Sequence, residues 1–254
     1  MKNIIIKKDL DIDVSSLDKE ITLSLLEGER FVFLGNIDRE NTIKIDVKDN
    51  AILHLSILTK SPIDALNIII NIGKNTHLIA YFADFSIEKN NTNVEVNLNE
   101  EGANLEWHLA SLSSKKDNKS ILVSAYHKAK STFARVDNYG VAKDDSKLLF
   151  AGTSHILNGM SKSKTHQNAK IMVFDSNSDA IAKPILKIDE NDIEASHAAA
   201  VGKISDEHLF YLTSRGLSLD DAKMLITLGY LKPIFKGFSD KKVEVINEIM
   251  GGLL

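Results

Sequence analysis

The main pattern between about residues 20 and 190 is an alternation of apolar and polar side chains. Successive side chains of a β-strand point to opposite faces, so this alternation predicts strands with one buried face. The apolar positions of five such runs are Ile43, Ile45 and Val47; Leu53, Leu55 and Ile57; Leu66, Ile68, Ile70 and Ile72; Val94, Val96 and Leu98; and Leu105, Trp107 and Leu109. This part of the chain is therefore predicted to be β.

Polar turn residues separate the runs, and no strict repeat length is visible. Many short strands without helical crossovers suggest a sandwich, a barrel or a β-solenoid. The chain has 13 glycines and 3 prolines, and its one Asn-Gly dipeptide is Asn158-Gly159, so tight hairpins are poorly signalled. Stacked coils of a parallel β-helix need no such hairpins. The pattern favours a solenoid and leaves the sandwich and the barrel as alternatives.

After residue 204 the apolar spacing becomes helical. Three helices are predicted, each with its own start and stop signals. The signals are Ser205-Asp206-Glu207 and Gly216 for the first, Ser218 with Asp221 and then Pro233 for the second, and Ser239-Asp240 and Gly251-Gly252 for the third. We therefore expect a β core over residues 1–204, with a poorly defined segment at 1–20, and a small helical domain over residues 205–254.

Composition narrows the function classes. The chain has 254 residues, 43% of them hydrophobic, and a formal charge of -4. One basic stretch holds Lys115, Lys116, Lys119, Lys128 and Lys130. We interpret it as a solvated face, because nucleic-acid binders usually carry a net basic domain. No nucleic-acid partner is expected.

The chain contains no cysteine, which excludes disulfides, thiolate metal ligands and cysteine nucleophiles. The apolar run near the N-terminus, Ile4-Ile5-Ile6, is too short for the core of a signal peptide. No segment approaches the ~18 apolar residues of a membrane span. We expect a soluble, cytoplasmic protein with no membrane partner.

Residues 183–202 resemble a motif region of the SufB/SufD family, P-x-L-x-I-x-x-x-D-V-x-C-S-H-x-A-T-x-G. The similarity continues through residues 206–216, which match the family's D-E-x-L-F-Y-L-x-S-R-G. It is specific over residues 153–235 and looser over 115–152. Residues 1–114 share only the β pattern.

This resemblance implies a right-handed parallel β-helix followed by helices that dock the SufC ATPase. In the family, two scaffold subunits pair edge to edge, and a nascent iron–sulfur cluster is built at their interface. The resemblance thus implies a non-enzymatic scaffold with two partners, a SufC-type ATPase and a SufB-like subunit or a second copy of this chain. It implies no permanent cofactor, only a transient cluster. The chain has no G-x-x-x-x-G-K-[ST] motif, so ATP chemistry falls to the partner.

The resemblance also indicates a candidate cluster ligand. His197 lies where the family keeps a histidine at the scaffold interface, and Glu194 precedes it on the same predicted strand. The alternative is a hydrogen-bonded structural histidine. Three departures make the chain more SufD-like than SufB-like: Ala195 replaces the family's interface cysteine, Ala198 replaces a glutamate, and Gln167 is followed by Asn168 rather than leading to a cysteine.

Candidate partner-binding residues lie in the helical region. The run around Pro233 is expected to face an ATPase, since exposed aromatic residues mark interfaces, and Arg215 is expected to cap a helix or pair with the partner. The candidates are Arg215, Tyr230, Leu231, Ile234 and Phe235. The apolar residues Leu209, Phe210, Tyr211, Leu225 and Ile226 are interpreted chiefly as core.

Two alternatives remain open. The chain could be a sole scaffold paralogue that pairs with itself, bringing two copies of His197 to a two-fold axis. It could also be a β-helix enzyme acting on polysaccharide, although aromatic residues are only 6% of the chain and no cluster of carboxylates appears on a strand.

Overall fold

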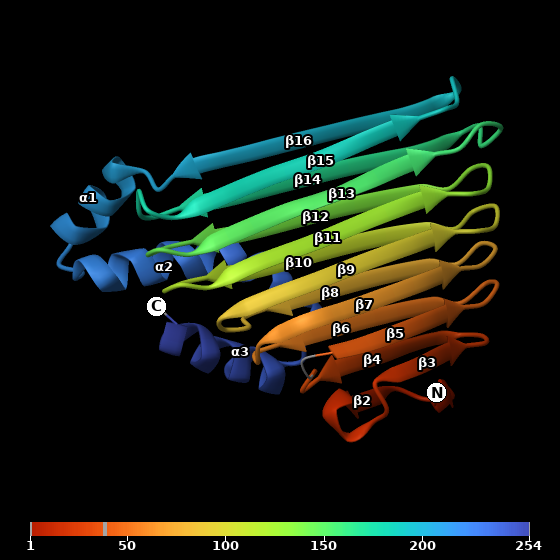
Figure 1. Cartoon of the computed structure of the whole chain (residues 1–254), viewed down its shortest axis with the longest axis horizontal. Helices are drawn as coiled ribbons and strands as arrows, with labels where there is room; N and C mark the ends of the chain where they lie inside the picture. The colour runs from red at the N-terminus through yellow and green to blue at the C-terminus, as the bar shows by residue number, and fades with distance from the viewer. Residues whose placement is uncertain (1, 38–39, 254) are drawn as a thin grey trace.

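The computed structural model describes residues 2–37 and 40–253. Two parallel eight-stranded sheets face one another across the core, and the chain alternates between them at each coil (Figure 1). Odd-numbered strands form one sheet and even-numbered strands the other. The fold is thus a parallel β-solenoid followed by helices, which confirms the predicted fold class.

The strands lengthen along the chain. The odd sheet comprises β1 (Lys2–Ile5), β3 (Glu20–Leu25), β5 (Glu40–Val47), β7 (Ile63–Ile72), β9 (Lys89–Leu98), β11 (Asn118–His127), β13 (Lys147–Ile156) and β15 (Asp179–Ile188). The even sheet comprises β2 (Leu10–Asp13), β4 (Glu29–Gly35), β6 (Ile52–Thr59), β8 (His77–Asp84), β10 (Asn104–Ser113), β12 (Phe133–Ala142), β14 (Ser163–Val173) and β16 (Ile193–Lys203).

The coils also grow in length, which explains why no strict sequence repeat is visible. Paired residues are 22 positions apart where β2 (Leu10) meets β4 (Val32). The separation is 29 positions between β11 and β13, and 32 between β13 and β15. A repeat search assumes a constant period, so a coil that widens by about ten residues escapes it.

Acidic side chains hold one corner of the stack together. Glu88, Lys115 and Asp144 each adopt a positive φ, the left-handed conformation of tight turns. The backbone N–H of each donates to an acidic side chain one coil further on: Asp117 accepts from Glu88 at 2.7 Å, Asp144 accepts from Lys115 at 2.8 Å, and Asp175 accepts from Asp144 at 2.8 Å. These bonds satisfy backbone groups that the turns leave free.

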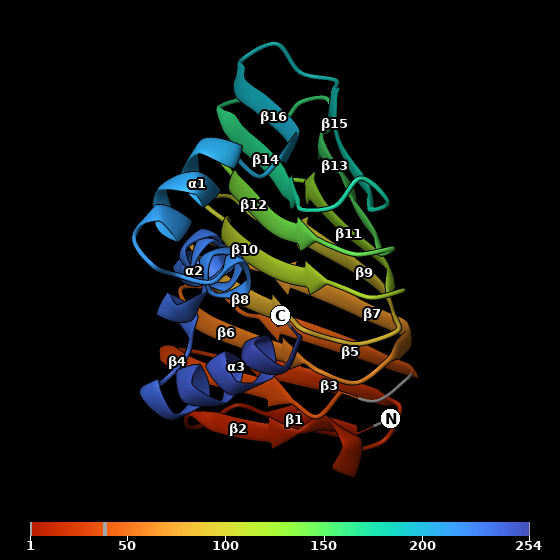
Figure 2. The same ribbon diagram turned by 90° about the vertical axis from the view of Figure 1, so that its left-hand side faces the viewer.

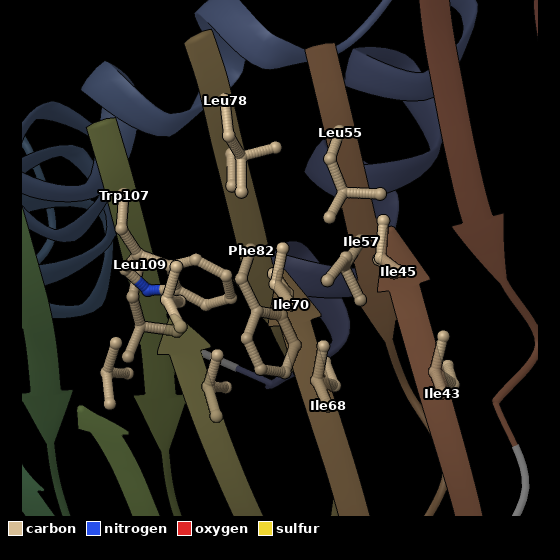
Figure 3. Close-up of a cluster of buried hydrophobic side chains, with 14 of the residues drawn as sticks. Ile43, Ile45, Leu55, Ile57, Ile68, Ile70, Leu78, Phe82, Trp107 and Leu109 are labelled. Carbon is tan, nitrogen blue, oxygen red and sulfur yellow. The ribbon is translucent and has the colours of Figure 1, made fainter. Parts of the chain in front are cut away.

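Between the sheets, the inward-facing side chains of the middle coils interdigitate (Figure 3). Ile43, Ile45, Ile68 and Ile70 from the odd sheet meet Leu55, Ile57, Leu78, Phe82, Trp107 and Leu109 from the even sheet, and all are 1% exposed or less. Each such side chain contributes roughly 1.5–3 kcal/mol of transfer free energy. The predicted apolar faces of all five runs are buried as expected.

The C-terminal helices cover the outer face of the even sheet (Figure 2). They are α1 (Asp206–Ser214), α2 (Leu219–Leu231), the 3₁₀ helix η2 (Lys232–Gly237) and α3 (Asp240–Leu253). A second apolar cluster joins α2, η2 and α3 to β6, β8, β10 and β12. α1 contributes no buried residue, so it is the least anchored of the helices.

The predicted helix starts are confirmed, and one predicted end is wrong. Ser205 accepts a hydrogen bond from the His208 N–H, and Ser218 accepts one from the Asp221 N–H. Gly216 has φ +95, as a glycine that ends a helix should. The third helix continues through Gly251-Gly252 to Leu253, because Met250 and Leu253 are buried against the sheet and stabilise its last turn.

The N-terminal coil is covered as well. Its 3₁₀ turn η1 (Val14–Ser16) follows β2, so residues 2–19 contain two short strands and a turn. Lys242 of α3 forms an ion pair with Asp11 at 2.9 Å and lies 3.8 Å above the Phe33 ring. The last helix of the chain therefore reaches back to the first coil.

Candidate functional site

The C-terminal end of the solenoid is an open coil. β15 and β16 are the terminal strands of their sheets (Figure 1). Their side chains are half-buried or exposed throughout. β16 is 11 residues long, and the small residues Ala198, Ala199, Ala200 and Gly202 on it are all exposed. A long, flat edge with small side chains is a template for pairing with another strand.

The register shows which backbone groups of β16 are free. Ile204, just after β16, donates to the Val173 carbonyl of β14, and the Asp192 carbonyl, just before it, accepts from Lys162. Even-numbered residues of β16 therefore bond to β14. By strand alternation, the N–H and C=O groups of odd-numbered residues, including His197 and Ala199, face outward from the sheet edge.

β15 offers a poorer edge. Asp189 donates to the Ile156 carbonyl of β13, so odd-numbered residues of β15 bond inward and even-numbered ones face outward. Pro184 is one of the outward-facing residues and has no N–H to offer, which is a common way to blunt an edge strand. Pairing through backbone hydrogen bonds is therefore favoured at β16.

His197 lies in the middle of this edge. It is the register partner of Gln167 on β14, and Gln167 points into the solenoid and is only 5% exposed. Neighbouring strands in register place side chains on the same face, so His197 also faces the inside of the open coil. Because no further coil covers it, the imidazole is exposed.

Glu194 does not join His197. Residues three apart on a strand lie on opposite faces. Glu194 lies on the outer face and forms an ion pair with Lys164 at 2.7 Å. The hydrogen bond and charge of Lys164 lower the pKa of the Glu194 carboxyl below its ordinary value. The predicted pairing of Glu194 with His197 in one ligand set is therefore not supported by the geometry.

The edge holds too few ligands for a metal centre of its own. Among residues 2–37 and 40–253, no group of three or more His, Cys, Asp or Glu side chains could hold a metal ion. Stable iron–sulfur clusters usually have four protein ligands, mostly thiolates. His197 can offer one imidazole, so any further ligands would have to come from elsewhere.

A second exposed surface lies on α1 and α2. Phe210 is 73% exposed and Tyr211 57%, while Leu219 and Leu225 are each at least half exposed. The Arg215 guanidinium lies over the Tyr211 ring, 5.1 Å from its centroid. The interpretation of Phe210, Tyr211 and Leu225 as core is wrong: a helical stripe shows which residues share a face, but not what covers that face.

The expected exposure of the run around Pro233 is also corrected. Leu231 is 1% and Ile234 3% exposed, because both pack against the even sheet. Tyr230 packs edge-on against Tyr139, with ring centroids 5.7 Å apart, and burial raises its pKa to about 12. Phe235 is half-buried in the same cluster. Of the five candidate partner residues, Arg215 alone is exposed in the described structure.

The basic stretch contains an unexpected buried ion pair. Lys119 is 1% exposed, and its Nζ lies 3.2 Å from Asp84 and donates to the Leu112 carbonyl at 2.6 Å. The interpretation of this stretch as solvated is therefore wrong for Lys119. Lys119 lies two residues before Ile121 and four before Val123, and alternate residues of a strand share a face. Because Ile121 and Val123 face inward on β11, the sequence could have indicated that Lys119 is buried.

These features define a class: a parallel β-solenoid with a helical tail and a long, exposed edge strand at its C-terminal end. No helix in the described part of the chain is long and apolar enough to cross a bilayer. The chain belongs to the family described as SUF system FeS cluster assembly, SufBD core domain, whose model matches residues 20–230. That match also covers residues 20–114, where the sequence shares only the β pattern.

Curated relatives agree with this assignment. The chain is 34% identical over 125 residues to the iron–sulfur cluster assembly protein SufD of Bacillus subtilis, a match that covers 47% of this chain and 29% of that protein. It is 29% identical over 110 residues to a SufBD family protein of Staphylococcus saprophyticus, covering 43% and 24%. The match thus spans less than a third of either relative.

Proposed function

We propose that this chain is a non-catalytic scaffold subunit for iron–sulfur cluster assembly. Membership of the SufBD family supports a scaffold role in that process. The observation that carries the proposal is the unpaired edge of β16, with an exposed histidine at its centre and small side chains beside it. A cytoplasmic location belongs to the same proposal.

In this proposal, β16 pairs with the equivalent strand of a SufB-like subunit. The cluster is cargo at the junction, and His197 supplies one ligand. A cysteine-bearing partner would add the thiolates that this chain lacks. A second copy of this chain would add only another imidazole, so the heterodimer is the better cluster site.

The exposed surface of α1 and α2 is the proposed docking site for a SufC-type ATPase. Its four large apolar side chains, Phe210, Tyr211, Leu219 and Leu225, give it the character of an interface core. Asp206, Glu207, Asp220 and Asp221 in the first turns of the two helices surround it with negative charge. The ATPase surface that fits here is apolar with a basic rim.

Co-expression tests the proposal. The chain is expected to co-purify with a SufB-like subunit and a SufC-type ATPase. Phe210→Asp should remove the ATPase and leave the scaffold pair intact. The matched control is Val245→Asp, which places the same charge at an exposed apolar position of α3. Retention of neither partner by the wild-type chain would contradict the proposal.

The role of His197 is tested by anaerobic reconstitution of the scaffold pair with iron and sulfide. His197→Ala should lower the iron retained per pair. His77→Ala, on β8 in the middle of the even sheet, is the control for loss of a histidine at a site remote from the edge. Unchanged iron retention in His197→Ala would remove this residue from the ligand set.

A further inference from the structure

The inside of the last coils contains buried polar side chains that nothing described so far explains. Asn138 of β12, Ser154 of β13, and Thr165 and Gln167 of β14 all point inward and are 5% exposed or less. Among the described residues, the Asn138 Oδ1, the Ser154 and Thr165 hydroxyl oxygens, and both amide atoms of Gln167 have no hydrogen-bond partner. Each unsatisfied buried group costs on the order of 1–3 kcal/mol.

Two of these residues line one small cavity. Asn138 and Gln167 share it with Val123, Val136, Phe150 and Gly152, and it has room for about one water molecule. Gly152 is part of the reason for the space: a Cβ at this position would overlap the Val123 carbonyl, so only glycine fits. The cavity lies under the open coil, since β15 contributes Pro184 to its wall.

The chemistry of the lining selects the ligand. None of the ten described residues that line the cavity is charged, so an ion would be buried without a counter-charge, at high cost. An apolar ligand would leave the amides unsatisfied. A water molecule donates and accepts two hydrogen bonds each, and can serve the Asn138 carbonyl oxygen and the Gln167 amide together.

We propose that this cavity is a binding site for one ordered water molecule, and that the water holds the Gln167 amide in place beneath His197. Gln167 and His197 are register partners on the same face. An anchored amide at that position gives the imidazole a fixed neighbour, which selects its orientation and tautomer. Gln167 is thus a positioning residue; its relevance to cluster assembly rests on the proposed function, whereas the water site does not.

Whether Gln167→Met lowers or raises the melting temperature of the isolated chain tests the water site. Gln167→Met keeps the side-chain volume but removes the amide, leaving the water and Asn138 short of partners, so the melting temperature should fall by about 2–4 °C. The double variant Asn138→Leu with Gln167→Met removes both polar side chains from the cavity lining. Its melting temperature should return most of the way to that of the wild type. If the site is dry, Gln167→Met relieves an unsatisfied amide and raises the melting temperature, which would overturn the proposal.

Two spectroscopic measurements complete the test. A water–protein NOE to the Gln167 side-chain amide is expected in the wild type, and its absence would count against the bound water. The ¹⁵N shifts of the His197 imidazole report its tautomer ratio, which should change in Gln167→Met and stay unchanged in Ser154→Ala, a buried polar residue outside the cavity lining. An unchanged ratio in both variants would remove the positioning role. Neither measurement requires a partner, so failure here is distinct from failure of the scaffold proposal.

Discussion

At the N-terminal end of the solenoid, β1 and β2 are four residues long, a 3₁₀ turn follows them, and α3 is tied to the coil through Lys242 and Asp11. At the C-terminal end, β15 and β16 are ten and eleven residues long, and β16 presents a full row of free backbone groups beside small side chains. Short strands and cover protect an edge from pairing, whereas length and flatness invite it. The difference makes the C-terminal end of the stack better suited to strand pairing than the N-terminal end.

The interior differs along the same axis. In the middle coils, the buried Asp84 carboxylate accepts hydrogen bonds from Thr59, Ser86, Asn90 and Ser111 and pairs with Lys119. In the last coils, the Gln167 amide has no partner among the described residues. The Asp84 carboxylate is thus satisfied by side chains of its own chain, whereas the Gln167 amide finds no partner among the described residues.

The largest effect is expected from a substitution that removes the buried cation beside Asp84. Lys119→Met leaves the Asp84 carboxylate buried without its cation, so the free energy of unfolding at pH 7 should fall by about 3–5 kcal/mol. Urea denaturation measures this. The matched control is Lys116→Met, an exposed lysine of the same stretch, which should stay within about 0.5 kcal/mol of the wild type. Equal, small effects of both substitutions would show that the pair is not buried.

The buried pair of Asp84 and Lys119 also predicts that the free energy of unfolding depends on pH. Burial alone raises the pKa of Asp84, but the Lys119 charge and the hydrogen bonds from Ser111 and Ser86 outweigh it and hold the pKa below the ordinary value of 3.8. The stabilisation is therefore present above pH 3.8 and is lost as pH falls through the lower folded-state pKa. In Lys119→Met, burial is expected to raise this pKa, so the defect should shrink between pH 7 and pH 4.

The next effect concerns His127, which is buried at the end of β11 near the open coils. Burial, with a smaller contribution from His155, lowers its pKa from 6.5 to about 4. Its neutral form is stabilised, so this contribution is complete above pH 6.5 and about 3 kcal/mol of it is lost as pH falls to about 4. Urea denaturation of wild type and His127→Gln from pH 7 to 4.5 should show a flatter profile in the variant. If the free energy of unfolding depends on pH equally in the wild type and in His127→Gln, His127 is not the source of that pH dependence.

The smallest effect on stability is expected from alanine substitutions at two glycines of the last coils. Gly152→Ala forces a Cβ against the Val123 carbonyl and should cost about 1–3 kcal/mol. Gly202→Ala, on β16, meets no atom within 4 Å and should be nearly neutral. Thermal denaturation of the two variants distinguishes the packed coil from the open edge. A large loss for Gly202→Ala would mean that β16 is covered within the chain itself.

Much of the fold was predictable because its signals are local. The alternation of apolar and polar residues predicted the buried faces of the strands, and the capping hydroxyl groups of Ser205 and Ser218 predicted where two helices start. Coil length was not predictable, because both the strands and the turns change in length from coil to coil. The contact surface of the helices was also missed: whether Phe210 or Leu231 is covered depends on how the helices sit on the sheet, which the local sequence does not encode.

The candidate site was only partly predictable. The motif located His197, and its place on an edge strand depends on where the stack ends. The separation of Glu194 from His197 was visible in the sequence, since three residues along a strand reverse the face. The burial of Lys119 was visible in the same way. For both Glu194 and Lys119, the position along the strand determines the environment of the side chain more strongly than the residue type does.

The measurement that tests the central claim most directly is association with a SufB-like subunit, followed by sedimentation, for two proline variants. Ala199→Pro removes an outward N–H from β16 and leaves the ladder to β14 intact. Asn3→Pro does the same at the free edge of β1, where Ile6 donates to Ser24 and odd-numbered residues face outward. We expect Ala199→Pro to weaken association at least about tenfold and Asn3→Pro to leave it unchanged. Equal affinities for both variants, or a loss confined to Asn3→Pro, would contradict the account.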